Sequence, residues 1–257
     1  FRVDNEAIEK DVALAKAYGA KFQYNTKVKS IDELKAKGYT HVIVAAGAWK
    51  PGVLKLETGE AMNVIAFLEQ FKKDPSALRL GSDVVIIGGG NTAMDAARAA
   101  KRVPGVQNVR LVYRRDQRNM PADEEELELA IQDGVEFCPL LAPAAFQDGK
   151  LSCHKMALGE PDASGRRTPV DTGKLETVPA TAVIAAVGEK VDDGLYQEMG
   201  IAVNERGRAK TNPETLETNL SNVYVIGDGN HGPATVVEAI ADASKAVKAI
   251  SNIDLDR

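Results

Sequence analysis

Hydrophobic residues along this chain fall into short continuous runs, typical of buried strands, that alternate with stretches of helical spacing. The helical spacing predicts helices over residues 5–18, 31–37, 61–71, 122–132 and 233–250. The continuous runs predict strands over residues 21–25, 41–45, 84–87, 109–113, 136–141, 151–158, 181–187 and 222–226. The polar stretch 159–176 is expected to form a loop because it has too little apolar content to pack. Strands that alternate with helices predict an α/β fold with a mainly parallel sheet.

The most informative segment is the apolar strand that runs into the glycine turn 88–90 and then into an alanine-rich helix. Proteins use this strand-turn-helix to hold a dinucleotide pyrophosphate. Gly88 would permit the tight turn, Gly90 would let the backbone approach the phosphates, and Ala93 would let the helix pack closely on its strand. The first amides of that helix would then face an anion.

The strand over residues 109–113 should lie beside the first strand and end near the adenosine ribose. A fold that prefers NAD carries an acidic residue there, which accepts from the 2'-hydroxyl. This chain has Arg114 and Arg115 instead. Guanidinium groups pair well with a 2'-phosphate, so these residues predict NADP rather than NAD. The alternative is a structural glycine turn with a solvated arginine pair.

Three apolar strands end in small residues, at Ala46-Gly47, at 186–188 and at Gly227-Asp228. Ligands of doubly wound sheets lie across the carboxyl ends of the strands, so these positions are candidate cofactor contacts. Asp228 could accept hydrogen bonds from sugar or ribityl hydroxyls, while the helix that follows could point amides at a phosphate or a flavin carbonyl. The alternative for Asp228 is a turn or helix cap. The order of these ends around the glycine turn suggests an interrupted domain.

Composition narrows the classes of partner. The net charge is −5 without a long basic run, which argues against nucleic acid and anionic membranes. No apolar run approaches the ~18 to 20 residues of a membrane span and no secretory signal is evident, so a cytoplasmic location is expected. Cys138 and Cys153 lack the spacing of iron-sulfur or zinc ligands and are expected to behave as small buried apolar residues. His231 could approach a flavin or could simply be exposed. No metal site is predicted.

Six segments in order carry a family resemblance: VIVAAGAWKP, VVIIGGGNTAMDAAR, VYRRDQRNMPA, LGEPDASGRR, AVIAAVG and VYVIGDGNHGPATVVEAI. Together they resemble the NADPH- and FAD-binding unit of the glutamate synthase small-subunit family, which includes the related module of dihydropyrimidine dehydrogenase. The final segments are most similar to selenate reductase iron-sulfur subunits. The resemblance spans nearly the whole chain, and LGEPDASGRR and YRRxxxxMPA are far more specific than a glycine turn alone.

The resemblance implies a flavoprotein with two Rossmann-like dinucleotide-binding domains. An NADPH domain, residues 80–190, would be inserted into a FAD domain formed by residues 1–79 and 191–257. NADPH would deliver a hydride to the flavin N5, and the flavin would pass single electrons to iron-sulfur clusters held elsewhere. The implied NADPH contacts are Gly88, Gly89, Gly90, Asn91 and Thr92 at the pyrophosphate, Arg114 and Arg115 at the 2'-phosphate, and Gly188 at the nicotinamide side. The implied FAD contacts are Ala46, Gly47, Gly227, Asp228 and Thr235.

The chain departs from the family at one point, because the family places its first FAD fingerprint ahead of the position of Phe1. We therefore expect a central piece of a longer polypeptide, whose partners are N-terminal and iron-sulfur domains. Such a piece should bind NADPH competently and FAD poorly, and it should be inactive as an isolated oxidoreductase. No catalytic side chain is expected, since positioning of donor and acceptor carries hydride transfer. The alternative function is a non-catalytic nucleotide-binding or subunit-docking domain.

Overall fold

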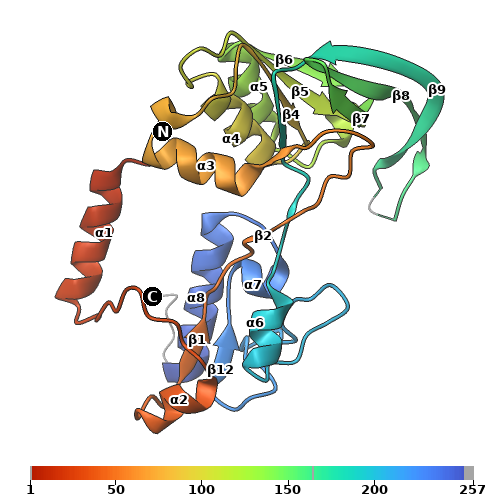
Figure 1. The fold of residues 1–257 in the computed structure, drawn as a ribbon. Coiled ribbons are helices and arrows are strands. Elements are labelled where there is room, and N and C mark those ends of the chain that lie inside the picture. The colour runs from red at the N-terminus through yellow and green to blue at the C-terminus, as the bar shows by residue number, and fades with distance from the viewer. Residues whose placement is uncertain (1, 164, 252–257) are drawn as a thin grey trace. The chain divides into compact units, whose positions relative to one another are not determined.

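The computed structural model describes residues 2–163 and 165–251 of the 257-residue chain. The chain divides into two compact units (Figure 1). Unit 1 comprises Phe1–Lys50 and Glu189–Arg257, and unit 2 comprises Pro51–Gly188. Unit 2 is therefore inserted into the sequence of unit 1.

Unit 2 contains a five-stranded sheet in the order β3-β10-β4-β5-β6, and every pairing described within it is parallel. Its strands are β3 (Met62–Asn63), β4 (Asp83–Ile87), β5 (Asn108–Tyr113), β6 (Val135–Pro139) and β10 (Ala182–Ala185). Its helices are α3 (Val64–Lys73), α4 (Asn91–Ala100) and α5 (Glu124–Gln132), with short 3-10 turns η1 (Pro75–Ala77) and η2 (Gln117–Asn119). The expected α/β class with a parallel sheet is confirmed.

The two faces of this sheet are both buried, which explains why its strands are continuously apolar. Along β4, Val84 and Ile86 point into a core shared with α3, α4 and α5. Val85 and Ile87 point the opposite way, into a second core that includes Leu151. The second core lies against an antiparallel sheet of β7 (Leu141–Gln147), β8 (Lys150–Pro161) and β9 (Arg167–Pro179).

The expected cysteine environment is also observed. Cys153 is fully buried in the second core and Cys138 is half-buried beside it. Burial raises the pKa of the Cys138 thiol to about 11 and that of Cys153 to about 12, so both thiols stay protonated at neutral pH.

The prediction of a loop over residues 159–176 is wrong, because most of this stretch forms the end of β8 and the strand β9. The strand needs few apolar side chains, since backbone pairing with β8 and cross-strand polar pairs hold it. His154 Nδ1 lies 2.9 Å from Asp171 Oδ2, and Lys155 Nζ lies 2.7 Å from Glu176 Oε2. The low apolar content reflects an exposed face rather than an absence of structure.

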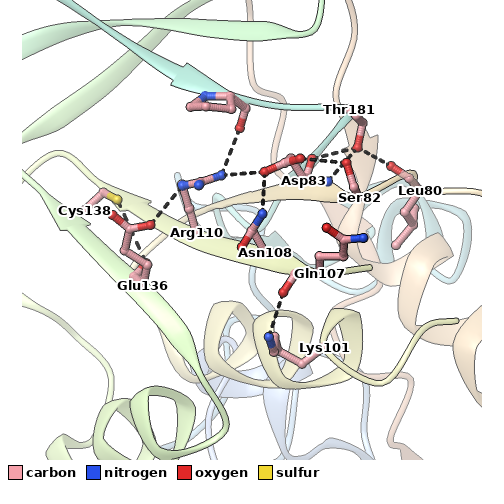
Figure 2. A network of polar contacts seen from close by, with 11 residues as sticks. Leu80, Ser82, Asp83, Lys101, Gln107, Asn108, Arg110, Glu136, Cys138 and Thr181 are labelled. Atoms are coloured by element: carbon pink, nitrogen blue, oxygen red, sulfur yellow. Dashed lines mark hydrogen bonds and ion pairs between the residues drawn. The ribbon is translucent and has the colours of Figure 1, made fainter. Parts of the chain in front are cut away.

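A polar network ties the amino-terminal parts of neighbouring strands in the parallel sheet (Figure 2). The Arg110 guanidinium lies between two carboxylates, 3.0 Å from Asp83 Oδ1 and 2.9 Å from Glu136 Oε2. The Asp83 amide donates to Thr181 Oγ1 at 3.0 Å, just before β10. Hydrogen bonds from Ser82 and then Arg110 lower the pKa of Asp83. This anchoring lies at the end of the strands opposite to the glycine turn.

Unit 1 is built around a parallel pair of strands, β1 (Val42–Val44) and β12 (Val223–Val225). Its other elements are α1 (Asn5–Ala17), α2 (Ile31–Ala36), α6 (Asp193–Glu198), α7 (Asp228–His231), α8 (Val236–Ser251) and β11 (Glu189–Lys190), which pairs with β2 (Lys50–Pro51) at the boundary with unit 2. The predicted strand over residues 21–25 is wrong, since these residues are exposed and pair with no strand of the described structure. The final helix begins at Val236, later than predicted, because Thr235 and Glu238 form a capping box there.

The position of the boundary between the units differs from the sequence expectation. We expected residues 1–79 to belong together and the second domain to begin at residue 80. The structure places residues 51–79 in unit 2, because α3 buries Val64, Phe67 and Phe71 in the same core as α4. An amphipathic helix follows the surface that buries its apolar face, and the sequence alone does not identify that surface.

Candidate functional site

The turn after β4 contains two glycines that the protein itself requires. Gly88 has φ +154°, and a Cβ there would clash with the backbone carbonyl of Ala186. A Cβ on Gly89 would clash with the ring of Tyr113. Ala93 is fully buried, and a Cβ on Gly88 would lie 3.1 Å from the Ala93 Cβ, so the expected close packing of helix on strand is present.

Gly90 is different, because nothing in the described structure requires a glycine at that position. Its φ is −99°, which any residue adopts, and the nearest heavy atom to an added Cβ is Pro121 Cγ at 4.0 Å. Gly90 is the N-cap of α4 and supplies no side chain to cap the helix. No side chain therefore caps the first amides of α4, and a helix N-terminus of this kind suits an anion.

The glycine turn is tied to the segment that follows β5, residues 114–123, which we call the 114–123 loop. The Ala122 amide donates to Gly89 O at 3.0 Å. The Asn91 side chain exchanges two hydrogen bonds with Asp123, Nδ2 to Oδ2 at 2.9 Å and Asp123 N to Oδ1 at 3.0 Å. The Asn91 side chain is thus occupied by Asp123. A ligand could contact only the backbone of Asn91. Thr92 follows it in the first turn of α4.

The structure separates the two arginines that the sequence paired. The Arg115 side chain is 8% exposed, and its Nη2 lies 3.0 Å from Asp162 Oδ2. Arg115 Nε also donates to the Arg167 carbonyl at 2.7 Å. Arg114 is exposed and has no hydrogen bond or ion pair to any described residue. The same is true of Arg118 on η2, a residue that sequence reasoning missed although the motif YRRDQRNMPA contains it.

A cavity of about 690 Å³ lies over the 114–123 loop and the start of α5. It is lined by Asp116, Gln117, Arg118, Met120, Ala122, Asp123, Glu124 and Leu127. The cavity contains carboxylates as well as Arg118, but Asp116 Oδ1 accepts from the Asn119 side chain at 2.6 Å and Asp123 is engaged with Asn91. Their charge is therefore partly offset by internal donors.

Gly188 lies at the same edge of the parallel sheet as the glycine turn. The end of β10 is held against β4 by the Ala186 amide, which donates to Ile87 O at 2.8 Å. Gly188 has φ +103° and no heavy atom within 4 Å of an added Cβ. A ligand that crosses the end of β4 can therefore approach the Gly188 backbone.

The strand ends of unit 1 are also adjacent, as predicted, since β1 and β12 are parallel and Ile226 N donates to Val44 O at 3.1 Å. They border a cavity of about 240 Å³. Its lining residues are Ala45, Gly47, Ile226, Gly227, Asp228, Ala234, Thr235, Val236 and Ala239. Ala46 lies between two of these positions in the sequence.

Internal hydrogen bonds occupy several polar groups of this second turn. Asp228 Oδ1 accepts from the Ala234 amide at 3.2 Å, so part of the capping alternative is observed. The Gly227 amide donates to Asp242 Oδ2 at 2.9 Å, a contact from α8 that sequence reasoning missed. His231 is half-buried, with Nδ1 2.8 Å from Gly232 O and Nε2 3.5 Å from Asp242 Oδ2. His231 therefore faces protein groups.

The described residues lack two further features. No cluster of three or more His, Cys, Asp or Glu side chains in that part of the chain could hold a metal ion. None of the helices described there combines the length and apolar character that crossing a membrane would need.

Comparison with known proteins gives the family. The family model for pyridine nucleotide-disulphide oxidoreductases matches residues 4–243. Over 97% of its length the chain is 42% identical to the protein YgfK of Escherichia coli (strain K12), 33% identical to the NADP(+)-dependent formate dehydrogenase subunit beta of Moorella thermoacetica, and 32% identical to the glutamate synthase [NADPH] small chain of Azospirillum brasilense. The chain spans 24%, 37% and 56% of these relatives. The last match confirms the resemblance to glutamate synthase small chains.

Solved structures show the same fold at low identity. FprA of Mycobacterium tuberculosis superposes with a TM-score of 0.71 at 20% identity, over 96% of this chain and 72% of FprA. Thioredoxin reductase of T. acidophilum gives 0.70 at 19% identity, over 97% and 81% of the two chains. With a family model that covers most of its length, the chain belongs to the pyridine nucleotide-disulphide oxidoreductases.

Proposed function

We propose that this chain is the coenzyme-binding module of an NADPH-dependent flavin oxidoreductase that passes electrons to iron-sulfur clusters outside the segment. Unit 2 binds NADPH, and unit 1 supplies part of the FAD site. When bound, NADPH supplies a hydride and FAD accepts it. The proposal depends most on Gly90. No neighbouring atom of the described residues requires a glycine at this position, whereas a pyrophosphate at the start of α4 would.

The residues of unit 2 have distinct parts in this proposal. The backbone of residues 88–92 holds the pyrophosphate at the N-terminus of α4. Arg114 and Arg118 pair with the 2'-phosphate, because both guanidinium groups are exposed and unpaired among the described residues. Arg115 already binds protein acceptors, so we do not assign it a phosphate oxygen. Gly188 leaves room for the nicotinamide side at the end of β10.

The residues of unit 1 offer less to a ligand. Gly47, Gly227, Asp228 and Thr235 line the second cavity, and Asp228 is placed to accept from hydroxyls of FAD. The cavity is about a third of the size of that in unit 2, and the adjacent Val236 is exposed. We therefore propose that the chain binds FAD more weakly than NADPH and is inactive without further domains. Purified chain that retains one equivalent of flavin by absorbance would contradict this.

The first experiment substitutes Gly90 by Ala and measures the NADPH dissociation constant by calorimetry. The methyl group should leave the unfolding transition unchanged, because it has room, and should weaken NADPH by about tenfold or more, because it enters the pyrophosphate position. Unchanged affinity in the folded variant would overturn the proposal. Failure of the unsubstituted chain to bind NADPH would favour the alternative of a non-catalytic docking domain.

The second experiment tests the phosphate contacts by comparing NADPH with NADH. The double variant Arg114→Ala/Arg118→Ala should weaken NADPH by about 10- to 100-fold and leave NADH within twofold, since only NADPH carries the 2'-phosphate. Arg79→Ala is the matched control, because Arg79 is an arginine of unit 2 whose guanidinium binds the Ser76 and Leu78 carbonyls near η1. Equal losses for the two coenzymes would remove the arginines from the proposal.

A further inference from the structure

The motif LGEPDASGRR has no part in the coenzyme contacts proposed above, yet it touches the 114–123 loop. Its described residues form the end of β8, part of the turn and the start of β9, and we call residues 159–163 and 165–167 the hairpin tip. We propose that the hairpin tip is a brace that positions Arg114 and Arg118 and so sets the preference for NADPH over NADH. Arg115 and Asp162 are its positioning residues. The inference rests on the proposed function, in which Arg114 and Arg118 bind the 2'-phosphate.

Three contacts join the hairpin tip to the loop, although the two segments are far apart in sequence. Arg115 Nη2 lies 3.0 Å from Asp162 Oδ2, and Arg115 Nε donates to Arg167 O at 2.7 Å. In the opposite direction, the Arg167 amide donates to Asn119 Oδ1 at 2.7 Å. Among the described residues, Arg115 and Asn119 are the two polar or charged residues that are buried. Hydrogen bonds from a buried guanidinium, one of them to a carboxylate, fix geometry.

The alternation of fixed and exposed residues is what makes this a brace. Arg115 directly follows Arg114, and Asn119 directly follows Arg118. Each exposed guanidinium therefore extends from a residue whose neighbour is held by the hairpin tip. The loop between them has only one short 3-10 turn of regular structure, so its own backbone gives little rigidity.

Asp162 shapes the hairpin tip and binds the loop at the same time. Its Oδ1 accepts from the Arg166 amide at 3.2 Å, and its backbone N–H donates to Arg166 O at 2.7 Å. Its other carboxylate oxygen, Oδ2, meets Arg115. A turn built around Asp162 thus presents a carboxylate to Arg115 in one orientation.

Asn119 continues the brace toward the glycine turn. Its side-chain Nδ2 donates to Asp116 Oδ1 at 2.6 Å, and its backbone carbonyl accepts from Tyr113 Oη at 2.8 Å. The Tyr113 ring in turn lies against Gly89. The brace therefore links the hairpin tip, the cationic loop and the phosphate turn within unit 2. Guanidinium groups that are already held in position lose less conformational freedom when they bind a phosphate. NADH has no 2'-phosphate, so its affinity should not depend on the brace.

Two variants test the brace. Arg115→Met keeps the apolar stem and removes the guanidinium, and Asp162→Asn keeps the shape of the turn residue and removes its charge. Each should weaken NADPH by about 5- to 10-fold with NADH within twofold, a size expected for residues that act through a neighbour. In the Arg114→Ala/Arg118→Ala background, the same changes should have no further effect on NADPH. Glu176→Gln is the matched control, because it disrupts the exposed pair with Lys155 between the same two strands.

The outcomes separate this inference from the proposed function. If Arg114→Ala/Arg118→Ala weakens NADPH selectively while both brace variants bind it normally, the brace is overturned and the phosphate contacts stand. If the brace variants weaken both coenzymes equally, or if their losses add fully to those of the double variant, a positioning role is overturned. If the double variant leaves NADPH binding unchanged, the phosphate assignment fails, and the brace fails with it.

Discussion

Units 1 and 2 contain the same local motif, a parallel strand that ends in a glycine turn before a helix. The two units differ in how many strands surround that motif. In unit 2 the strand lies inside a five-stranded sheet, and Val84, Val85 and Ile86 have no exposed surface. In unit 1 the parallel sheet of the described chain has two strands, and Ile43 in the middle of β1 is 41% exposed. A glycine turn is therefore a local feature, whereas the surface that surrounds a ligand depends on the neighbouring strands and helices.

The charges around the two turns also differ. The loop that is tied to the turn of unit 2 has two exposed cations, Arg114 and Arg118, besides the carboxylate of Asp123, whereas in unit 1 the carboxylates Asp228 and Asp242 bond to amides of the turn and of the loop after it. Cations suit a phosphorylated ribose and carboxylates suit hydroxyl groups. On the proposed function, the residues around the two glycine turns would therefore distinguish one coenzyme from the other more than the turns themselves do.

The largest expected effect on stability comes from adding one methyl group to each turn by a Gly→Ala substitution. Gly88→Ala should destabilise unit 2 by about 3 kcal/mol or more, because the new Cβ meets the Ala186 carbonyl, which is backbone and cannot rotate away. Gly227→Ala should cost unit 1 less, about 1–3 kcal/mol, because its φ of +62° and ψ of −147° lie in a region that only glycine adopts readily, while its closest neighbour is the Ala239 Cβ at 3.4 Å. Denaturant unfolding followed by circular dichroism would measure both. Equal losses would show that the turns are supported alike.

An intermediate effect is expected on the stability of unit 2 at low pH, where protonation of Asp133 breaks ion pairs between the ends of α4 and α5. Hydrogen bonds from Arg102 and Arg98 lower the pKa of Asp133 to about 2 from the usual 3.8. Because the folded state has the lower pKa, this stabilisation is complete above pH 4 and is lost as the pH falls toward 2. It should amount to about 1–2 kcal/mol after solvent screening.

Asp133→Asn provides the control for the acid experiment. The variant should be less stable than the original chain at pH 6, and the difference between the two should shrink between pH 4 and pH 2. Unfolding free energies measured at each pH test this. A difference that stays constant over this range would mean that the Asp133 carboxylate contributes no pH-dependent stability.

The smallest effect is expected on the outer face of α8. Val236 is 76% exposed and Ile240 is 60% exposed, so changing both to Ser should alter the stability of unit 1 by less than about 0.5 kcal/mol per site. The matched change Val64→Ser on α3 removes a side chain that is 1% exposed, and it should cost unit 2 about 2 kcal/mol or more. Thermal unfolding distinguishes them. A large loss from the α8 changes would mean that this face is buried in solution.

The sequence was sufficient to predict those features that depend on neighbouring residues. The strand, the turn and the helix around Gly88 follow from an apolar run and small residues, and their observed bounds agree within a few residues. The parallel pairing of β4 with β5 was predicted for the same reason. Polar strand β9 was missed, because its pairing energy lies in the backbone of β8 rather than in its own side chains.

Long-range partners explain the remaining differences. Arg115 is expected to contact a phosphate because its neighbours in sequence suggest one, whereas its observed carboxylate partner Asp162 lies 47 residues away in a stretch expected to be a loop. The boundary between the units was misplaced because α3 packs on α4, which no local pattern in residues 61–71 reveals. Spatial neighbours, rather than sequence spacing, decide both cases.

The unequal requirements on the three glycines affect how such turns are interpreted in other chains. Gly88 and Gly89 must be retained by any descendant that keeps this fold, whether or not it still uses a coenzyme, because any larger residue collides with the protein. Only Gly90 can be replaced without disturbing the protein around it. If Gly90 serves only the coenzyme, as proposed, a lineage that abandons nucleotide binding should lose this third glycine first.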